Sequence, residues 1–315
     1  MTISGTNTFT QTRNQIINRA LSMIGVKTRG RNPTSDEMNE ASIILNMMVK
    51  SWKSKGQYLW KTTEGTLFLA TGQTTYKIDG STANATEDFN QTTTTAAAIL
   101  GDSTIDIINA TGFVVGYNIG ILQTNGIIHW TTISSITALT IGLTDNLTEA
   151  VKLGAKVYAY QTKINRPERI SSSRLRYSSG SSDVPVAKIS RDTYFNYSSK
   201  TSQGKPNSFF YDKQLAFGQI YLYPTPNDVS DTIKFTFEKQ FFDFSQAVDD
   251  PDFPVEWLLT IATNLAYLLT FDYGISTERA ERLKRDGIEL LADSEGYDKE
   301  DTSIYFQPSM LGENG

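Results

Sequence analysis

The residues of this chain that could carry out chemistry are few, and the densest group of them is acidic. Four carboxylates stand close together ahead of an apolar stretch: Asp249, Asp250, Asp252 and Glu256. Two carboxylates suffice to hydrolyse a glycosidic bond, one as general acid and the other as base or nucleophile. Acidic residues just before a helix also cap its N-terminus and complement its dipole. The group therefore fits either a hydrolase or an ordinary helix start.

The chain has no cysteine and one histidine, His129. Thiolate nucleophiles, zinc fingers and iron–sulfur clusters need cysteine, and catalytic triads and zincin sites need histidine. The sequence also lacks the phosphate-binding GxxxxGK and GxGxxG motifs, the zincin HExxH motif and the GxSxG nucleophile elbow. We therefore expect no metal, no cofactor and no enzymatic activity, and we expect His129 in a solvated strand position.

Basic residues gather in two stretches of the sequence. The first is Lys27, Arg29 and Arg31, and the second is Lys163, Arg166, Arg169, Arg174 and Arg176. The second alternates with serine, as in a polar loop that follows a nucleic-acid backbone without reading bases. Because no aromatic side chains are interleaved with them, a solvated surface or ion pairs between subunits explain both stretches as well.

Charge is unevenly distributed along the chain. Residues 1–61 hold nine basic and three acidic residues, whereas residues 243–315 hold five basic and sixteen acidic ones. The net charge of −5 argues against a protein that coats nucleic acid. The asymmetry is suited to aligning copies head to tail or steering a partner. Two ordinarily solvated helix faces explain it equally well.

Apolar residues spaced by three and four predict helices near both ends of the chain, over 12–25, 34–56, 255–273 and 276–293. Thr34 and Glu37 form a capping box at the start of the second helix. Each helix has one apolar stripe that must be buried against a neighbour. We therefore expect an αα-hairpin at the N-terminal end and a second helix pair near the C-terminal end.

Between the helix pairs the apolar period changes to two, which predicts strands near 64–78 and over 184–190, 207–212, 219–223 and 232–238. Residues 99–161 carry about five short strands of their own. The preceding stretch, from Gly80, is rich in Thr, Ala and Asn and predicts a linker or exposed loop. We therefore expect an inserted β domain.

The predicted fold class is α+β. It consists of a four-helix bundle from the N- and C-terminal helix pairs, a central antiparallel β region, and an inserted small all-β barrel or sandwich. The expected parts are a core of residues 1–79 and 164–293, an inserted domain of residues 80–163, and an extended C-terminal arm of residues 294–315. No run of about 18 apolar residues occurs, so we expect no membrane span.

Several segments, in this order, resemble the head-to-tail adaptor proteins of tailed phages, chiefly the packaged-DNA stabilisation (head completion) family of short-tailed phages. The first are RNQIINRALSMIGV, TSDEMNEASIILNMMVKSW, YLW and TGQTTYKI. VPVAKISRDTYFNYSSKTSQGKPNSFFYD with QIYLYPTP resembles the family's middle region, and PVEWLLTIATNLAYLLTFDYGIS its closing helix pair. The resemblance covers nearly all of residues 10–293 except the stretch from about 80 to 163. Compact members lack that stretch, although GFVVGYNIGI and GIIHWTTISSI resemble an insert that some relatives carry.

The resemblance implies a structural virion protein that is assembled in the host cytoplasm and located at the portal vertex, between head and tail. Such proteins form a ring, typically of twelve copies, that extends the DNA channel and retains the packaged genome. The implied partners are further copies of the chain, the portal protein, a tail or nozzle protein, and packaged double-stranded DNA contacted without sequence specificity. No membrane partner is implied.

Two sets of site residues follow as hypotheses. The acidic C-terminal arm is expected to dock on the portal through apolar anchors, namely Tyr297, Ile304, Tyr305, Phe306, Met310 and Leu311. Arg169, Arg174 and Arg176 are expected to grip DNA phosphates in a channel whose acidic residues keep the DNA mobile. The alternative function is a virion-associated glycan-binding module built on the insert, or a cell-wall hydrolase that uses the carboxylates Asp250 and Glu256.

Overall fold

The computed structural model describes residues 9–28, 30–52, 59–178 and 182–297. Contacts divide the chain into two compact units. The helical unit comprises residues 1–60 and 241–315, and the β unit comprises residues 61–240. Both ends of the sequence therefore contribute to one unit, so the basic N-terminal and acidic C-terminal segments belong to the same unit.

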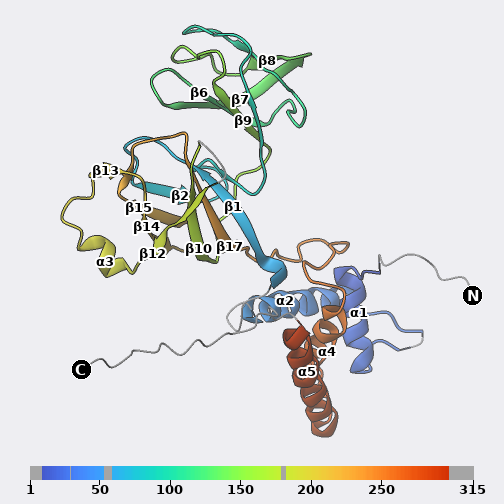
Figure 1. Cartoon of the computed structure of the whole chain (residues 1–315). Coiled ribbons are helices and arrows are strands. Elements are labelled where there is room, and N and C mark those ends of the chain that lie inside the picture. Colours follow the sequence, from blue (N-terminus) through green and yellow to red (C-terminus); the bar gives the residue numbers. More distant parts are fainter. Residues whose placement is uncertain (1–8, 29, 53–58, 179–181, 298–315) are drawn as a thin grey trace, which may run out of the picture. The chain divides into compact units, whose positions relative to one another are not determined.

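The helical unit contains α1 (Arg13–Met23), α2 (Ser35–Trp52), α4 (Trp257–Leu269) and α5 (Thr277–Tyr297) (Figure 1). The central helix is α4, which packs against α1, α2 and α5. The four predicted helices are therefore present, and α5 continues four residues beyond its predicted end. Their arrangement as a four-helix bundle stays a prediction.

Local signals in the sequence fix the starts and ends of these helices. At the start of α2, the Glu37 backbone N–H donates to Thr34 Oγ1 at 3.3 Å, and the Thr34 N–H donates to Glu37 Oε2 at 2.7 Å. This geometry confirms the predicted capping box. After α1, Gly25 adopts φ +83°, a left-handed conformation that favours glycine and ends the helix.

The apolar stripes of the helices meet in one core. Ile16, Leu45, Ile261 and Leu265 are completely buried there. Burying each such side chain stabilises the folded state by about 1.5–3 kcal/mol. Most of α4 is buried, which explains why its apolar face looked broad in the sequence. The helix α5 contributes far less, since only Ser294 and Gly287 among its described residues are buried.

The β unit begins after a short 3₁₀ helix (Leu59–Lys61) and contains two facing sheets. One sheet has the strand order β11-β10-β17-β1-β3, formed by β1 (Thr62–Phe68), β3 (Ala85–Thr86), β10 (Arg169–Arg176), β11 (Asp183–Pro185) and β17 (Thr232–Glu238). The other has the order β12-β14-β15-β2, formed by β2 (Thr75–Ile78), β12 (Ala187–Lys188), β14 (Ser208–Lys213) and β15 (Gly218–Tyr223). Side chains from both sheets, including Leu67, Phe209 and Phe235, share one buried core.

Two smaller elements complete this part of the unit. They are the helix α3 (Arg191–Phe195) and the parallel pair β13 (Gln203–Gly204) and β16 (Thr225–Pro226). Neither element is predicted from the sequence, because both are too short to show a periodic pattern of apolar residues. Most strand pairs of the unit are antiparallel, as expected, and β12 pairs with β14 in parallel.

A third sheet, of six strands, forms the insert. Its order is β4-β9-β6-β7-β8-β5, from β4 (Asn90–Thr93), β5 (Thr104–Asp106), β6 (Asn118–Leu122), β7 (Ile128–Thr137), β8 (Thr140–Leu143) and β9 (Lys156–Tyr160). The sheet curls as a half-barrel, and the chain beyond its two outer strands is bridged at Thr94 and Ile107. Isoleucine and valine side chains, among them Ile119 and Val157, fill its core.

Two sequence interpretations are corrected by the strands. The serine-rich stretch with the arginines was interpreted as a polar loop, but it forms β10, between β11 and β17. A bulge between Ile170 and Ser172 interrupts the alternation that would have marked the strand. The stretch from Gly80 was interpreted as a linker, but it holds β3, which pairs with β1, and β4 of the insert.

The protein is therefore a mixed α+β molecule with mostly sheet content and five helices in the described residues. The predicted boundaries at residues 79, 163 and 293 stay predictions. In the described ranges, no helix is both long enough and apolar enough to cross a membrane.

Candidate nucleic-acid interface

The three arginines predicted to line a DNA channel all lie on β10, where the strand pairing fixes their positions. Arg174 is opposite Lys234 of β17, and Arg176 is opposite Thr232. Because side chains alternate along a strand, Arg174 and Arg176 point to the same face of the sheet. The opposite face carries Leu175, which is buried in the core between the two sheets.

Arg174 and Arg176 are held by carboxylates of the same chain. Arg174 Nη2 lies 2.6 Å from Glu64 Oε1, and Arg174 Nε lies 2.9 Å from Asp183 Oδ2. Arg176 binds both oxygens of Asp183, each at 2.8 Å. Such bidentate pairing is the strongest form of side-chain ion pair. The partners that the structure gives these residues lie within the chain, and ion pairs between subunits stay a prediction.

The ion pairs shift the pKa values of their members. The hydrogen bond to Glu64 raises the pKa of Arg174, and the hydrogen bond to Asp183 raises that of Arg176. The hydrogen bond from Arg176 lowers the pKa of Asp183 below its ordinary value. All three groups are therefore charged over the whole physiological range of pH, and the two arginines are neutralised by Asp183 and Glu64 together.

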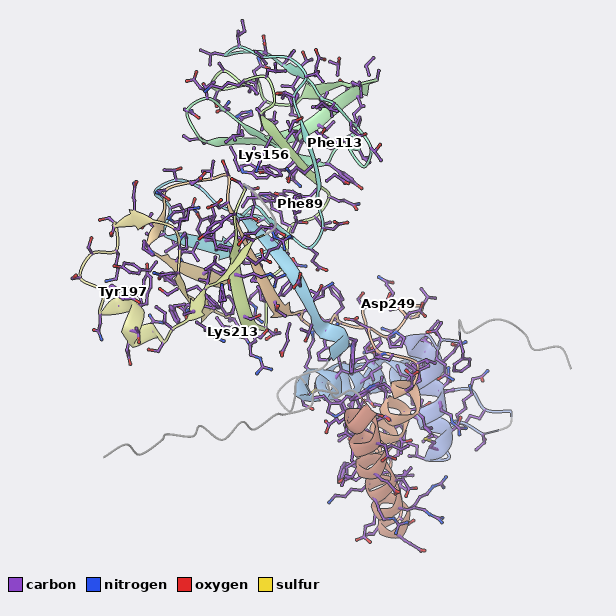
Figure 2. The ribbon with its side chains drawn as sticks, viewed as in Figure 1. Phe89, Phe113, Lys156, Tyr197, Lys213 and Asp249 are labelled. Carbon is purple, nitrogen blue, oxygen red and sulfur yellow. The ribbon has the colours of Figure 1, made fainter. Side chains whose placement is uncertain are left out.

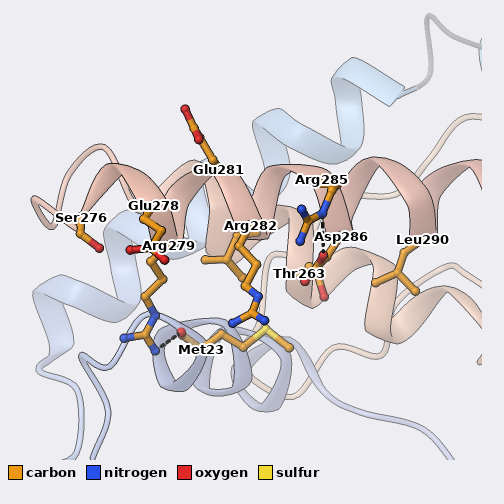
Figure 3. A pocket seen from close by; sticks show the side chains of 11 residues that line it. Met23, Thr263, Ser276, Glu278, Arg279, Glu281, Arg282, Arg285, Asp286 and Leu290 are labelled. Atoms are coloured by element: carbon orange, nitrogen blue, oxygen red, sulfur yellow. Dashed lines mark hydrogen bonds and ion pairs between the residues drawn. The ribbon is translucent and has the colours of Figure 1, made fainter.

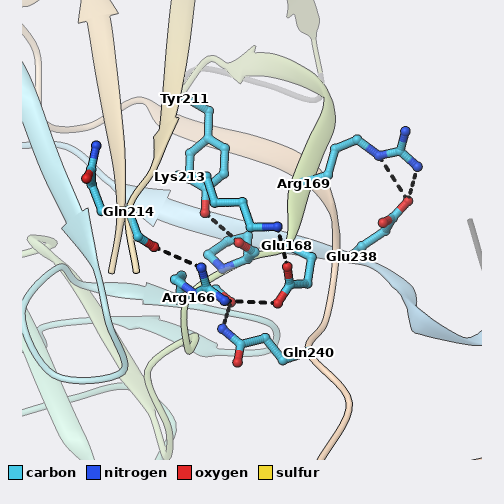
Figure 4. A network of polar contacts seen from close by, with 9 residues as sticks. Arg166, Glu168, Arg169, Tyr211, Lys213, Gln214, Glu238 and Gln240 are labelled. Carbon is cyan, nitrogen blue, oxygen red and sulfur yellow. Dashed lines mark hydrogen bonds and ion pairs between the residues drawn. The ribbon is translucent and has the colours of Figure 1, made fainter. Parts of the chain in front are cut away.

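Arg169 also has a partner, at the beginning of β10. Its Nε and Nη2 both bind Glu238 Oε1 of β17, with the Nε–Oε1 distance at 3.1 Å. Beside this pair, Arg166 Nη2 lies 3.1 Å from Glu168 Oε1, and Lys213 binds the other oxygen of Glu168 (Figure 4). The Glu168 side chain is 8% exposed. This network joins the ends of β10, β14 and β17 and has a structural role.

The other described cations of the two basic stretches also have hydrogen-bond or ion-pair partners. Lys163 Nζ donates to the Ser81 carbonyl at 2.8 Å, and burial lowers the pKa of Lys163. In the N-terminal stretch, Arg31 Nη2 lies 2.6 Å from Glu37 Oε1, and Lys27 Nζ donates to the Asn18 side chain. Arg29 lies outside the described residues.

Two cations that the sequence analysis did not single out lie beside Arg176. Lys156 begins β9 of the insert, Lys234 lies within β17, and both line the same cavity as Arg176. Each is an isolated lysine in its own strand, so no run of basic residues marks it in the sequence. Only the fold brings the three cations together.

The predicted portal-binding arm falls almost entirely outside the described residues. Ile304, Tyr305, Phe306, Met310 and Leu311 lie beyond residue 297, and Tyr297 is the last residue of α5. The positions of these anchors stay a prediction.

Asp249, one of the four clustered carboxylates, is held in a hydrogen-bonded loop. Asp249 Oδ2 accepts hydrogen bonds from the Gln246 N–H at 2.5 Å and from Ser245 Oγ at 3.1 Å. The backbone hydrogen bond lowers the pKa of Asp249. A general acid for glycoside hydrolysis needs a raised pKa. Asp249 therefore acts as a loop cap ahead of α4.

His129 lies on β7 of the insert and is half-buried. Its Nδ1 is 3.3 Å from Thr148 Oγ1, and its Nε2 is 3.4 Å from the Asp145 carbonyl oxygen. Within the described ranges, no three histidine or carboxylate side chains gather as metal ligands. The contacts of His129 are those of a polar side chain on a strand.

A groove of about 1090 Å³ runs along α5 in the helical unit. Arg279, Arg282 and Arg285 line it at a spacing of three residues (Figure 3). Arg279 Nη2 donates to the Met23 carbonyl at 2.6 Å and so closes one end of the groove. The groove combines basic, acidic and apolar side chains, and of these the arginines and Met23 are of types enriched in protein–protein contacts.

Comparisons with known proteins find no family model and no curated protein that matches the chain. Among solved structures, it is similar to the Gp54 tailspike of Acinetobacter baumannii bacteriophage AP22 in complex with A. baumannii capsular saccharide, at 12% identity and a TM-score of 0.22. That match covers 25% of this chain and 15% of the tailspike. VP17, a capsid protein of bacteriophage P23-77, is similar at 10% identity and a TM-score of 0.12, over 57% of this chain and 72% of VP17. Both TM-scores are too low to indicate a shared fold.

Proposed function

We propose that this chain is a head-to-tail adaptor of a tailed phage, a structural virion protein at the portal vertex. Copies of the chain form a ring under the portal, and the ring extends the DNA channel, retains the packaged DNA and offers the tail a platform. In this proposal the four helices of the helical unit form a bundle that belongs to the ring, and the protein carries out no catalytic step.

The observation that carries the proposal is that helices from both ends of the chain form one helical unit. The segments that resemble the adaptor family occupy α1 and α2 near one end and α4 near the other, and these helices share one core. The resemblance implies this combination of two distant helix pairs. The β unit lies between them in the sequence, as the middle region of the family does.

The exposure of α5 supports an assembly role. The helix has 21 residues, yet its described side chains touch the unit only along a narrow line that includes Leu283, Leu291 and Ser294. Ile288, on another face, is 58% exposed. A ring closes through one heterologous contact repeated with rotation. The exposed faces of α5, with the groove beside Arg282, offer a surface for that contact.

The carboxylate partners of the three arginines determine how DNA could bind them in the proposed channel. Arg169, Arg174 and Arg176 each have a carboxylate partner, so a DNA phosphate must compete with that carboxylate. Competition of this kind gives weak and readily broken contacts, which suit a channel through which DNA has to move.

The assembly state tests the proposal directly. The purified chain is measured by native mass spectrometry and by negative-stain microscopy, with and without purified portal rings. We expect ring-shaped oligomers, or a ring seated on the portal, with the same number of copies in both measurements. A chain that stays monomeric at all concentrations and does not join the portal contradicts the proposal.

Truncation tests the C-terminal arm separately. A chain that ends at Tyr297 keeps every described residue of α5. We expect the truncated chain to fold with an unchanged melting temperature and to lose binding to portal rings. Unchanged portal binding by the truncated chain shows that the arm residues from Ile304 to Leu311 are not the anchors.

A further inference from the structure

A cavity of about 360 Å³ in the β unit has an unusual charge pattern. Among its described lining residues are three cations, Lys156, Arg176 and Lys234, and no carboxylate. Its volume lies at the lower end of the range for small-molecule sites, about 300–1,000 Å³. Aromatic side chains form part of its wall.

Three separate strands place the cations around the cavity. Lys234 of β17 and Arg176 of β10 come from the five-stranded sheet, where Arg174 pairs with Lys234 and Thr232 pairs with Arg176. Lys156 comes from β9 of the insert, two residues before Tyr158, so both side chains point to one face of that strand. Figure 2 labels Lys156 and Phe89, which both line the cavity.

Aromatic packing joins the insert to the sheet next to the cavity. The ring of Phe68, on β1, lies 5.2 Å from that of Phe89 and 4.8 Å from that of Tyr158. Phe68 and Tyr158 are 3% and 2% exposed. This buried contact packs the insert against the five-stranded sheet beside the cavity.

The lining residues of the cavity supply three positive charges and no negative one. Glu64 and Asp183, which are not part of the lining, partly offset the charges around Lys234. Arg176 is paired with Asp183, but in the described part of the chain neither Lys156 nor Lys234 forms an ion pair. Lys156 Nζ donates to the Ser178 carbonyl at 3.2 Å, and Lys234 Nζ lies 5.2 Å from the centre of the Phe89 ring. Burial, and then the like charge of Arg176, lower the pKa of Lys234.

Two ammonium groups without a carboxylate, beside a half-neutralised guanidinium, form a site for an anion. Arg174 and Lys234 also lie directly opposite each other on β10 and β17, a position in which like charges destabilise a sheet. We propose that this cavity binds a phosphate group, with Lys156 and Lys234 as its main cationic donors and Arg176 as a third. Phosphate oxygens accept charge-assisted hydrogen bonds from lysine ammonium groups. The group comes either from free phosphate or from the backbone of a nucleic acid, since both present the same oxygens.

This inference rests on the cavity and not on the proposed ring. In the test, the full chain is titrated with inorganic phosphate, and binding is measured by isothermal titration calorimetry and by broadening of the ³¹P NMR line. The variant that carries both Lys156→Gln and Lys234→Gln should bind phosphate about a hundredfold more weakly, at about tenfold for each charge-assisted hydrogen bond lost. The matched control is Lys152→Gln, an exposed lysine of the same insert that does not line the cavity. The control should bind as the unaltered chain does.

The single variant Lys156→Gln keeps the test valid if the double variant does not fold. Lys156 is the first residue of its strand, so we expect the single change to leave the fold intact. Its far-UV circular dichroism should be unchanged while phosphate affinity falls about tenfold. The proposal is overturned if the unaltered chain binds no phosphate at about 10 mM, a concentration at which even a site of millimolar affinity would be detected. Equal phosphate binding by Lys156→Gln and Lys152→Gln overturns it as well.

A second arm of the experiment distinguishes the sources of the phosphate group. Fluorescence anisotropy measures binding of a short duplex DNA to the same variants at two salt concentrations. Parallel loss of phosphate and DNA binding in the lysine variants identifies the nucleic-acid backbone as the source. Loss of phosphate binding with no effect on DNA binding identifies a free phosphate. The DNA-retaining role of the ring can fail in either case without affecting the phosphate site.

Discussion

Asp183 is the residue on which the charge arrangement of β10 depends. It stands opposite Arg176 in the pairing of β10 with β11, and its two oxygens bind both Arg174 and Arg176. Lys234 lies opposite Arg174 on the other side of the strand. Without Asp183, these three cations would have only Glu64 as a nearby partner in the described network.

We expect Asp183→Asn to lower the free energy of unfolding by about 1 kcal/mol at pH 7, because it replaces a charge-assisted pair at a partly exposed site. The pKa of Asp183 in the folded chain lies below the ordinary value of 3.8. Its contribution is therefore present above that value and is lost as the pH falls through the folded pKa. Urea denaturation of both proteins at pH 7 and at pH 3 measures this difference.

The control for this prediction is Asp293→Asn, at an exposed position of α5. We expect that change to leave the free energy of unfolding within about 0.5 kcal/mol of the unaltered value. The ion pairs of Asp183 do not stabilise the sheet if Asp183→Asn lowers the free energy of unfolding at pH 7 by as little as the control does. The same conclusion follows if the loss of free energy of unfolding is larger at pH 3 than at pH 7.

Among the elements, α5 contacts α4 closely at Asn264. Asn264 Nδ2 donates to the Thr260 carbonyl at 2.9 Å and to the Gly287 carbonyl at 3.0 Å. A Cβ placed on Gly287 would lie 3.0 Å from Asn264 Oδ1, whereas a Cβ on Gly296 would meet nothing within 4 Å. The same helix thus holds one crowded and one open glycine.

We expect opposite effects when each glycine is replaced by alanine. Gly296→Ala should raise the free energy of unfolding by up to about 1 kcal/mol, since alanine is the better helix former. Gly287→Ala should lower it by about 1 kcal/mol, because displacing Asn264 breaks its bond between the helices and outweighs the gain in propensity. Thermal denaturation followed by circular dichroism compares the two. Equal stabilisation by both changes would show that Asn264 moves aside at no cost.

The elements also show what sequence patterns can and cannot predict. The helices α1, α2, α4 and α5 were predicted because caps and apolar stripes are local signals. The strands β5 to β9 of the insert were predicted because turn residues bound each of them. The strand β10 was missed because its bulge and its arginines hide the alternation of Ile170 and Leu175. The strand β4 was missed because its residues, from Asn90 to Thr93, include no large apolar side chain.

The candidate site was predicted only in part. The arginines of β10 were found because they cluster in the sequence, but their partners Glu64, Asp183 and Glu238 come from three other strands. No pattern in the sequence marks Lys156 or Lys234 as part of a site. A carboxylate or lysine that is distant in the sequence becomes a neighbour only through strand pairing, which no local pattern specifies.

At the scale of the whole molecule, the β unit is a continuous segment whose two ends meet. Thr62 pairs with Glu238 between β1 and β17, and the Lys239 N–H donates to the Lys61 carbonyl at 2.9 Å. Its three cores lie entirely within residues 61–240. The helical unit, in contrast, is interrupted in sequence between residues 60 and 241.

We expect the excised segment 61–240 to fold on its own, because closure of its ends by strand pairing needs no other part of the chain. Its urea unfolding should be cooperative, and its far-UV circular dichroism should be typical of β structure. The matched control protein joins residues 1–60 to 241–315 through a short Gly-Ser linker and should be helical. An excised β unit that lacks a cooperative transition would show that the division into two units does not reflect independent stability.

The sequence by itself determined the elements with local signals: the capped amphipathic helices, the bounded strands of the insert, the α+β class and the scarcity of catalytic side chains. Tertiary structure alone decided which charges meet. It pairs Arg174 and Arg176 with Asp183, leaves Lys156 and Lys234 without a carboxylate, and unites helices from the two ends of the chain. The physical reason is that caps and periodicity act over a few residues, whereas an ion pair or a cavity depends on strand register across long separations in sequence.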